Sequence, residues 1–272
     1  MDMAIARAAY RDEFWMQQMR MRNASGFVNF PMPSPNHPHC YQITALLAIF
    51  DQFRAFGNTT WLEAAQGGWD ILTESFVRID GSSALAEVAH NPGFPANSYH
   101  LRGAGETCCS VFWLKLCQRF QLLRPAEEKF SAAMEKVIFN GLLRQLDFDA
   151  SQPAAGWSGI RYHGQLEGQV ENASAGGTCC EGQGTRVFGS LPEYFFSVLH
   201  SGSDGMPTVS VNLYGNASIA LNVSAASLRP PPPAENRGAL RLISEGSFFP
   251  GASCVKDSSA SLCLSVPRYS TW

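Results

Sequence analysis

Two short cysteine motifs, about seventy residues apart, carry the residue types best suited to chemistry in this chain. The first reads Gly105-Glu106-Thr107-Cys108-Cys109, and the second reads Thr178-Cys179-Cys180-Glu181. Adjacent cysteines rarely form a disulfide with each other, because disulfide geometry does not suit neighbouring residues. Together the motifs offer a carboxylate and several thiols, a ligand set that a zinc ion accepts. Their spacing is equally compatible with buried free cysteines and a surface glutamate, because cysteine is among the most buried residue types.

The size and composition of the chain indicate a globular protein. Its 272 residues are enough to bury a hydrophobic core, as one large domain or two smaller ones. Hydrophobic residues make up 45% and charged residues 16%, which argues against disorder. A net charge of -3 and a pI of about 6.1 lack the basic character of nucleic-acid-binding proteins. No apolar run is long enough to span a bilayer, so we expect no membrane partner.

The glycosylation sequons favour a secreted or endomembrane location. Chance would supply about one or two of these motifs in such a chain. Five are present, at Asn23, Asn58, Asn172, Asn216 and Asn222. No signal-peptide pattern opens the chain, which reads as if it begins inside a domain. Cys254 and Cys263 flank a short loop and would be free to form a disulfide if the protein is exported.

The first two thirds of the chain are predicted to be helical. Apolar residues recur at helical spacing over 40–56, and Gly57 is expected to end that helix. Thr60 and Glu63 predict a capping box at the start of the next helix. Another helix is predicted after the first cysteine motif, and Pro125 is expected at the first position of a further helix. Amphipathic helices joined by glycine-rich loops indicate a layered helical barrel or bundle. Both cysteine motifs fall at loop-to-helix junctions, so their side chains can converge at one end of such a barrel.

The pattern changes near Ser201, where apolar and polar residues begin to alternate. Alternation over 209–213, 219–223 and 262–266 is typical of an antiparallel sheet or sandwich. We therefore expect a mainly α fold with appended β structure. The expected domains are a helical domain over 1–200 and an incomplete β-sandwich over 201–272.

With these residues in view, the chain resembles glycoside hydrolase family 127, the β-L-arabinofuranosidase family. Gly105 to Cys108 resembles the family's Glu-x-Cys zinc motif, and Cys179-Cys180 with Arg186 resembles its Cys-Cys motif at a helix start. Further similar segments lie at 135–143, 159–168, 209–214 and 264–269. The resemblance implies an (α/α)6 barrel followed by β-sandwich domains. This chain would then hold the second half of the barrel and part of one sandwich.

The resemblance also implies a zinc site and a sulfur nucleophile. Glu106, Cys108, Cys179 and Cys180 match the family's four zinc ligands, whereas Cys109 is extra and is expected in the core. In the family, the cysteine at the position of Cys179 attacks the anomeric carbon of a terminal β-L-arabinofuranoside, with retention of configuration. Zinc coordination and a helix N-terminus would both lower the pKa of such a thiol. The alternative is that Cys179 is a purely structural ligand in a closed zinc site.

Two further site residues follow from the resemblance. Glu87 lies at about the position of the family's acid/base glutamate, although Ala86 and Val88 replace the usual glycine and aromatic neighbours. An ordinary surface glutamate is the alternative for Glu87. His39 resembles a family histidine that contacts the sugar, and a plain loop residue is the alternative there.

The competing function is a non-catalytic, zinc-stabilised protein that binds carbohydrate or serves a structural role. A thiol redox protein is disfavoured, because the chain has no Cys-x-x-Cys motif. The resemblance to the family makes Zn²⁺ the expected cofactor. It makes a carbohydrate the expected partner, such as L-arabinofuranosides of glycans or of plant-type cell-wall polymers.

Overall fold

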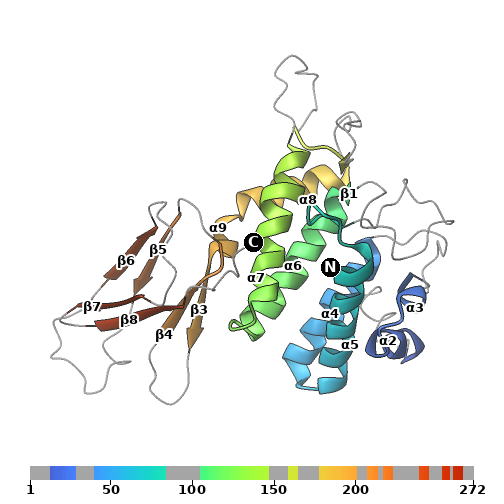
Figure 1. The fold of residues 1–272 in the computed structure, drawn as a ribbon, viewed down its shortest axis with the longest axis horizontal. Coiled ribbons are helices and arrows are strands. Elements are labelled where there is room, and N and C mark those ends of the chain that lie inside the picture. Colours follow the sequence, from blue (N-terminus) through green and yellow to red (C-terminus); the bar gives the residue numbers. More distant parts are fainter. Residues whose placement is uncertain are drawn as a thin grey trace. The chain divides into compact units, whose positions relative to one another are not determined.

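The computed structural model describes residues 13–28, 40–83, 105–146, 159–164, 178–200, 207–213, 217–222, 239–244, 253–257 and 260–265. The chain forms two compact units, each described by itself (Figure 1). The first unit comprises residues 1–119 and 136–189, and the second comprises residues 120–135 and 190–272. The described residues are mainly helical, with a smaller share of strands, as the sequence predicts.

Helices predominate among the described residues of the first unit. The α-helices of the chain are α2 (Glu13–Arg20), α3 (Ala24–Val28), α4 (Cys40–Phe56), α5 (Thr59–Ile71), α6 (Thr107–Leu123), α7 (Glu128–Lys136), α8 (Cys179–Gly189) and α9 (Pro192–Phe195). Wider or tighter turns extend two of them, as η1 (Leu72–Phe76) after α5 and as η3 (Val137–Leu142) and η4 (Leu143–Gln145) after α7. None of the described helices is long and apolar enough to cross a membrane.

The hairpin of α4 and α5 shows how local sequence sets the helix ends. Helix α4 spans the predicted range, and Gly57 ends it with φ +73°, a left-handed conformation that glycine adopts without strain. Asn58 caps α5, because its side-chain oxygen accepts a hydrogen bond from the Thr60 backbone N–H at 3.0 Å. The predicted capping box from Thr60 is therefore wrong by two residues. Glu63 instead pairs with Arg20 of α2 at 3.0 Å.

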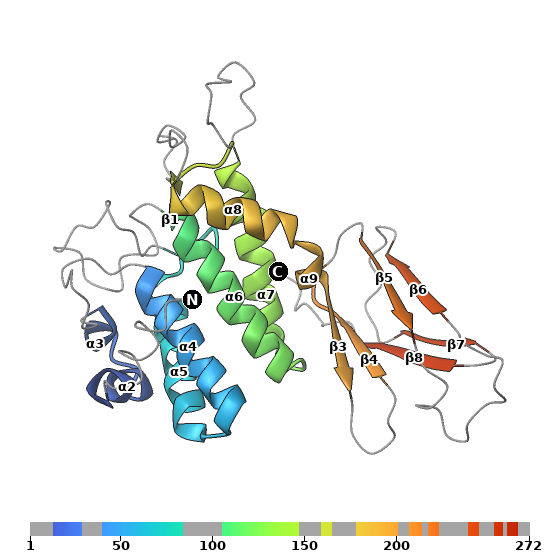
Figure 2. The ribbon, with the colours of Figure 1, turned by 180° about the vertical axis from the view of Figure 1, so that it is seen from behind.

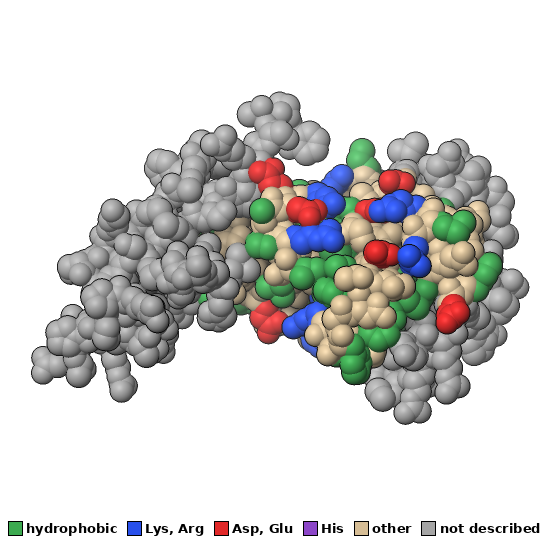
Figure 3. Space-filling view, turned by 90° about the horizontal axis from the view of Figure 1, so that it is seen from below, with side chains coloured by type: hydrophobic (Ala, Val, Ile, Leu, Met, Phe, Trp, Pro, Cys, Tyr) green, Lys and Arg blue, Asp and Glu red, His purple; other side chains and the backbone are tan. Residues whose placement is uncertain are grey.

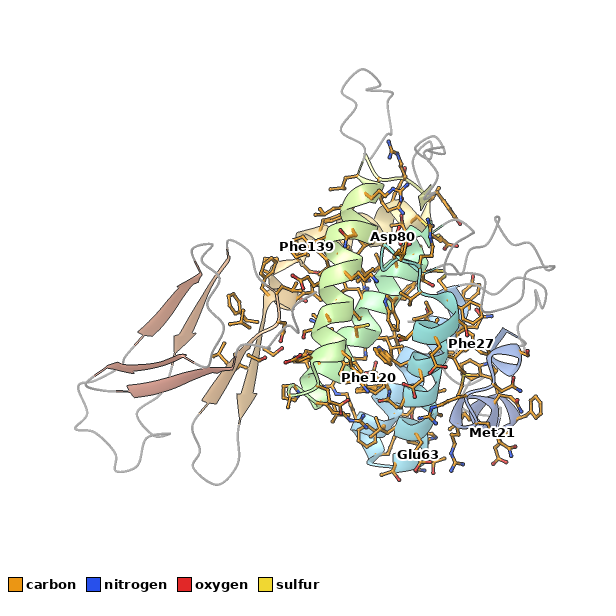
Figure 4. The ribbon with its side chains drawn as sticks, viewed as in Figure 1. Met21, Phe27, Glu63, Asp80, Phe120 and Phe139 are labelled. Atoms are coloured by element: carbon orange, nitrogen blue, oxygen red, sulfur yellow. The ribbon has the colours of Figure 1, made fainter. Side chains whose placement is uncertain are left out.

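The core of the first unit is built from large aromatic side chains. Trp69 of α5 stacks on Trp113 of α6 with ring centroids 5.6 Å apart, and its indole N–H donates to Cys117 Sγ at 3.4 Å. Phe27 lies against Phe76 with ring centroids 5.6 Å apart, which fixes α3 against the end of α5 (Figure 4). These contacts are consistent with a buried, structural role for the aromatic residues at helical spacing.

Helix α7 begins later than the sequence predicts. Pro125 lies in a turn, where the Glu127 N–H donates to the Arg124 carbonyl at 3.0 Å, and the helix starts at Glu128. Proline has no N–H, so it is tolerated in this turn as well as at a first helical position. Phe130 of α7 stacks on Phe120 in the second unit, with ring centroids 5.0 Å apart and planes 11° apart.

The strands in the described part of the chain form three small sheets. Strands β1 (Gly105–Glu106) and β2 (His163–Gly164) pair antiparallel within the first unit. In the second unit, β5 (Ala217–Asn222) and β6 (Ala239–Ser244) form an antiparallel pair. A four-stranded sheet has the order β3–β4–β8–β7, from β3 (Phe196–His200), β4 (Pro207–Val211), β7 (Ser253–Asp257) and β8 (Ala260–Ser265).

Two details of this sheet differ from expectation. The last described helix ends at Phe195, so strand structure starts five residues before the predicted end of the helical region at His200. Strands β4 and β8 run parallel, with Val209 opposite Leu264, whereas an antiparallel sheet was expected. The long stretch between β4 and β8 in the sequence permits such a parallel crossover. Whether residues 1–200 and 201–272 are the domains stays a prediction.

A buried polar network connects three elements of the second unit. Asn212 donates to Ser197 Oγ at 2.6 Å and to the Tyr194 carbonyl at 3.3 Å, and it accepts from Gln121 Nε2 at 3.2 Å. Asn212 is 1% exposed, so these bonds replace those it would make with water. Cys254 and Cys263 face each other in the register of β7 and β8, but their side chains lie outside the described residues.

Candidate metal and active site

The first cysteine motif is held in place by a short strand that leads directly into α6. Glu106 pairs with His163 across the β1–β2 ladder, and the Thr107 N–H donates to the Tyr162 carbonyl at 3.0 Å. The Thr107 hydroxyl adds a hydrogen bond to the Arg161 carbonyl at 2.7 Å. Glu106 and Cys108 therefore sit at a strand-to-helix junction whose backbone is fixed on both sides.

A buried arginine fixes the other side of this ladder. Arg78, at the end of η1, donates to the Gly164 carbonyl at 2.6 Å and lies 3.9 Å from Asp80. A Cβ at Gly105 would lie 2.4 Å from Ser82 Oγ and 2.9 Å from Arg78 Nη1, so any larger residue would have to displace these side chains. Gln145 of η4 donates to the Gly105 carbonyl at 3.2 Å. Sequence reasoning missed the role of Arg78, which carries no local motif.

The second cysteine motif begins α8 through a capping box. The Thr178 hydroxyl accepts from the Glu181 N–H at 3.4 Å, and the Glu181 carboxylate accepts from the Thr178 N–H at 3.2 Å. This reciprocal pattern fixes the first turn of the helix. Cys179 and Cys180 are consequently the first two residues of α8, where the helix dipole favours a negative charge. The Thr-x-x-Glu spacing in the sequence is the signal that would have revealed this box.

The fold brings the two motifs together at one end of the helices. Figure 2 shows α8 across the end at which α6 begins. The Cys108 N–H donates to Cys180 Sγ at 3.4 Å, although the two residues are 72 positions apart. The sulfur atoms of Cys108, Cys179 and Cys180 all lie within 4.8 Å of one another. Gly184 permits this packing, because a Cβ there would lie 2.8 Å from Ile160 Cγ2.

The carboxylate of Glu106 lies beside this three-sulfur group. Its Oε1 is 3.9 Å from Cys180 Sγ, and the side chain is fully buried. Glu106 is not among the three residues whose ligand atoms are all mutually within 4.8 Å. The two cysteine motifs thus converge as the sequence predicts, with Glu106 close to Cys180 and outside the mutual 4.8 Å limit of the three sulfurs.

Burial and mutual contact suppress ionisation of the inner thiols. The hydrogen bond with Cys108 raises the pKa of the Cys180 thiol, and burial and the Glu106 charge raise it further. The hydrogen bond with Cys180 lowers the pKa of Cys108, but the bond with Cys40 and burial outweigh it, so the net shift is upward. Both residues are buried, whereas Cys179 is exposed. Cys179 is therefore the one thiol of the three that a solute can reach.

Cys40 and Cys109 lie next to this group. The Cys40 thiol, at the start of α4, lies close enough to the side chains of Cys108 and Cys109 for both to influence its pKa, which is raised overall. Cys109 is fully buried, and burial raises its pKa. From the sequence, Cys40 could be predicted only to lie at the start of a helix. Its position next to α6 depends on tertiary packing and has no local signal.

The four side chains Glu106, Cys108, Cys179 and Cys180 offer the types of donor atom that zinc binds. Three thiols and one buried carboxylate are ligand types that zinc accepts in a tetrahedral site. Sulfurs bound to a common zinc ion lie about 3.8 Å apart, given Zn–S bonds of about 2.3 Å. Since the three sulfurs lie within 4.8 Å of one another, shifts of at most about 1 Å would bring them to that spacing.

The remaining predicted site residues have no described position. Glu87, the expected acid/base, and His39, the expected sugar contact, both lie outside the described residues. Their roles stay predictions. Arg186 is exposed on α8, and Trp113 is buried in the aromatic core.

Comparison with known proteins relates this chain to glycoside hydrolases. A GH127 β-L-arabinofuranosidase from Geobacillus stearothermophilus T6 is 20% identical, with a TM-score of 0.50 over 69% of this chain and 29% of that one. A second GH127 β-arabinofuranosidase structure is 20% identical, with a TM-score of 0.54 over 79% of this chain and 33% of that one. A structure described as a glycoside hydrolase is 11% identical, with a TM-score of 0.51 over 79% and 36%. No match was found among curated proteins.

At these identities the structures show a common fold, and the sequence itself defines the family. Residues 34–193 match the profile of the β-L-arabinofuranosidase GH127 catalytic domain, which is more than half of the chain. The chain belongs to this family of glycoside hydrolases, as the cysteine motifs indicated. It spans about a third of the length of the solved structures it matches.

Proposed function

We propose that this chain carries the metal ligands and the nucleophile of a retaining β-L-arabinofuranosidase. The observation that supports the proposal is the convergence of Cys108, Cys179 and Cys180, from two distant helix starts, to sulfur separations within 4.8 Å. Cys179 alone among them is exposed. A reactive thiol must be reachable from solvent, and Cys179 meets this condition at the first position of α8.

Glu106, Cys108, Cys179 and Cys180 would hold the zinc ion. When bound, zinc supplies positive charge that lowers the pKa of its thiol ligands. The backbone N–H and the hydroxyl of Thr107, which donate to the Tyr162 and Arg161 carbonyls, and the capping box at the start of α8 keep the ligands in place.

The reaction proposed for these residues has two steps. In the first, Cys179 Sγ attacks the anomeric carbon of a terminal β-L-arabinofuranoside, the bond to the leaving oxygen breaks, and Glu87 gives that oxygen a proton. In the second, Glu87 removes a proton from water, which attacks the same carbon and releases Cys179. Two displacements at one carbon retain its configuration. Glu87 enters this scheme from its position in the family motif alone.

The test uses a full-length protein that includes these residues and an aryl β-L-arabinofuranoside as substrate. Cys179→Ala is expected to abolish hydrolysis, whereas Cys117→Ser, a buried thiol bonded to Trp69, is the matched control and should retain it. Glu87→Gln should slow substrates with poor leaving groups most, because the first step then lacks its proton donor. Near-normal turnover by Cys179→Ser would return this residue to a structural role.

The cysteine cluster also fits a second candidate function, because Cys108, Cys179 and Cys180 could hold a metal ion without any chemistry at Cys179. A zinc-stabilised carbohydrate-binding or structural protein would keep the same ligands and lack turnover. Zinc bound at one equivalent, sugar binding without hydrolysis, and no effect of Cys179→Ala on sugar affinity would favour this candidate.

A further inference from the structure

We propose that Asn58 is an N-glycosylation site and that the proximal sugar of its glycan occupies the neighbouring cavity beside Trp61. Asn58 begins the sequon Asn58-Thr59-Thr60 and lies, exposed, between α4 and α5. It is one of the five sequons that the proposed glycosidase function leaves unused. The proposal implies that the protein passes through a compartment that glycosylates asparagine.

The geometry of Asn58 leaves its amide nitrogen free for a sugar. Its side-chain oxygen accepts from the Thr60 N–H at 3.0 Å, so the oxygen caps α5 while the nitrogen remains on the other side of the amide. Among the described residues, none accepts a hydrogen bond from this nitrogen. An N-linked sugar replaces one hydrogen on the nitrogen and keeps the oxygen, so the helix cap survives the modification.

The surroundings of Asn58 have room for a sugar and an aromatic face to contact it. A cavity of about 660 Å³ is lined by Glu13, Met16, Gln17, Arg20, Asn58, Thr60 and Trp61. A space of this size accommodates a small ligand such as one or two sugar units. Phe56 holds the Trp61 ring by an edge contact with centroids 5.9 Å apart, and Phe56 itself is 71% exposed. Indole and polar side chains together suit the mixed apolar and hydroxyl surface of a sugar.

The site is remote from the cysteine cluster. Helix α4 starts at Cys40, which contacts the cluster, and ends at Phe56, next to the sequon. Its 17 residues span about 25 Å. Figure 4 shows Glu63 near this opposite end of the α4–α5 hairpin. A glycan on Asn58 therefore lies away from the proposed nucleophile.

Asn23 provides the internal contrast. It also belongs to a sequon, but its Nδ2 donates to Gln18 Oε1 at 2.6 Å and its Oδ1 accepts from the Gly26 N–H at 3.3 Å. A sugar on this nitrogen would have to fit beside the Gln18 side chain, which is packed against Gly26. We expect Asn23 to be unmodified in the folded protein.

The chemistry requires a lipid-pyrophosphate-linked oligosaccharide as donor. The Asn58 nitrogen forms a bond to C1 of the first sugar and loses one proton, while the bond from C1 to the pyrophosphate breaks and the lipid pyrophosphate leaves with the electron pair. No oxidation or reduction takes place.

To test the modification, the full chain is expressed in a eukaryotic cell with a signal that directs it into the secretory pathway. All copies of the protein that reach the lumen are then purified. Glycans are then released with peptide-N-glycosidase in ¹⁸O water, which marks each occupied asparagine as labelled aspartate. The Asn58 peptide should carry the label in most molecules, and the Asn23 peptide should not. Thr60→Ala should remove the label and Thr60→Ser should keep it, because both variants preserve the Asn58 cap and only the second preserves the sequon.

A second measurement tests the cavity. Releasing the glycan should lower the Tm of the wild-type protein but leave that of Trp61→Ala unchanged, because only the wild type has the indole contact. Phe14→Ala is the matched control, since Phe14 is exposed on α2 and does not line the cavity, and it should behave as the wild type. An unlabelled Asn58 would overturn the proposed modification. An identical Tm change in wild type and Trp61→Ala would overturn the proposed sugar contact.

Discussion

Replacing Thr178 with alanine removes the hydroxyl that caps α8 directly before two of the clustered thiols. The two reciprocal bonds of this capping box measure 3.4 Å and 3.2 Å. Both exceed the usual N–H···O distance of about 2.9–3.0 Å, so we expect a loss of about 1 kcal/mol, below the upper limit for helix caps. For a chain of this size, 1 kcal/mol corresponds to a fall in Tm of about 2–4 °C.

Thr178→Ala should also weaken zinc binding, and the loss of zinc affinity should be larger than the small loss of folding stability suggests. Cys179 and Cys180 follow the cap directly, and groups that orient metal ligands commonly contribute about 10- to 100-fold in affinity. We expect a drop of about tenfold or more for Thr178→Ala, and near-normal binding for Thr178→Ser. The assays are thermal unfolding and a zinc titration against a chromophoric chelator, both on full-length protein.

Asn58→Ala is the matched control for this prediction. It removes the cap of α5, a bond of 3.0 Å at the other end of the hairpin from the cysteine cluster. Its effect on Tm should be similar, and its effect on zinc affinity should be absent. Equal losses of zinc affinity in the two variants would refute the reasoning, because they would then report general destabilisation rather than positioning of the thiols.

Three further predictions concern packing, a buried network and thiol access. Gly184→Ala should cost about 1–3 kcal/mol of stability, because its Cβ would lie 2.8 Å from a neighbouring methyl group. Gly182→Ala meets nothing within 4 Å and should stabilise α8 by up to about 1 kcal/mol. Equal Tm values in the two variants would contradict this prediction. Asn212→Ala should cost about 2–3 kcal/mol in urea unfolding, since its buried partners lose their hydrogen bonds, and a neutral result would show that they re-pair. Brief alkylation of the native protein with iodoacetamide should modify Cys179 before the five buried described cysteines, and mass spectrometry of peptides would reveal any other order.

Charged side chains at the surface contribute little to these predictions. Figure 3 shows positive and negative side chains interspersed on the face seen from below. Exposed pairs such as Arg20–Glu63 and Arg22–Asp70 are 3.0 Å and 2.8 Å long. Pairs of this kind are commonly worth about 0–1 kcal/mol, so changing them should affect Tm less than the buried changes above.

The helices could be predicted from the sequence where a local pattern determines them. The apolar stripe of α4 and the glycine after it set both ends of that helix correctly. The caps were harder, because Asn58 and Thr60 are both good capping residues and only the backbone geometry selects between them. Likewise, alternation predicted strands, but the parallel partner of β4 lies more than fifty residues away in the sequence and has no local signal.

The candidate site could be predicted only in part, for a similar reason. Two motifs gave the ligand types, and their positions at helix starts indicated that they can converge. The nearness of Cys40 could not be read from its neighbours in sequence, because it depends on the start of α4 lying beside the start of α6. The same holds for Arg78, whose guanidinium reaches the carbonyl of Gly164, a residue 86 positions away.

The cysteines of this chain differ in what their surroundings imply. Cys117 is an isolated buried thiol, whose pKa is raised by burial and which accepts a hydrogen bond from Trp69, so a structural role accounts for it. Cys108 and Cys180 are buried together with the Glu106 carboxyl; contact with Cys108 and burial raise the pKa of Cys180, while for Cys108 the contact with Cys40 and burial outweigh the lowering effect of Cys180, so its pKa also rises. Burying several acidic groups side by side costs free energy unless a cation compensates them. A divalent ion would reverse the sign of that interaction, because it favours thiolates over thiols. The arrangement is compatible with a metal site, and if zinc binds there, its removal should destabilise this end of the fold.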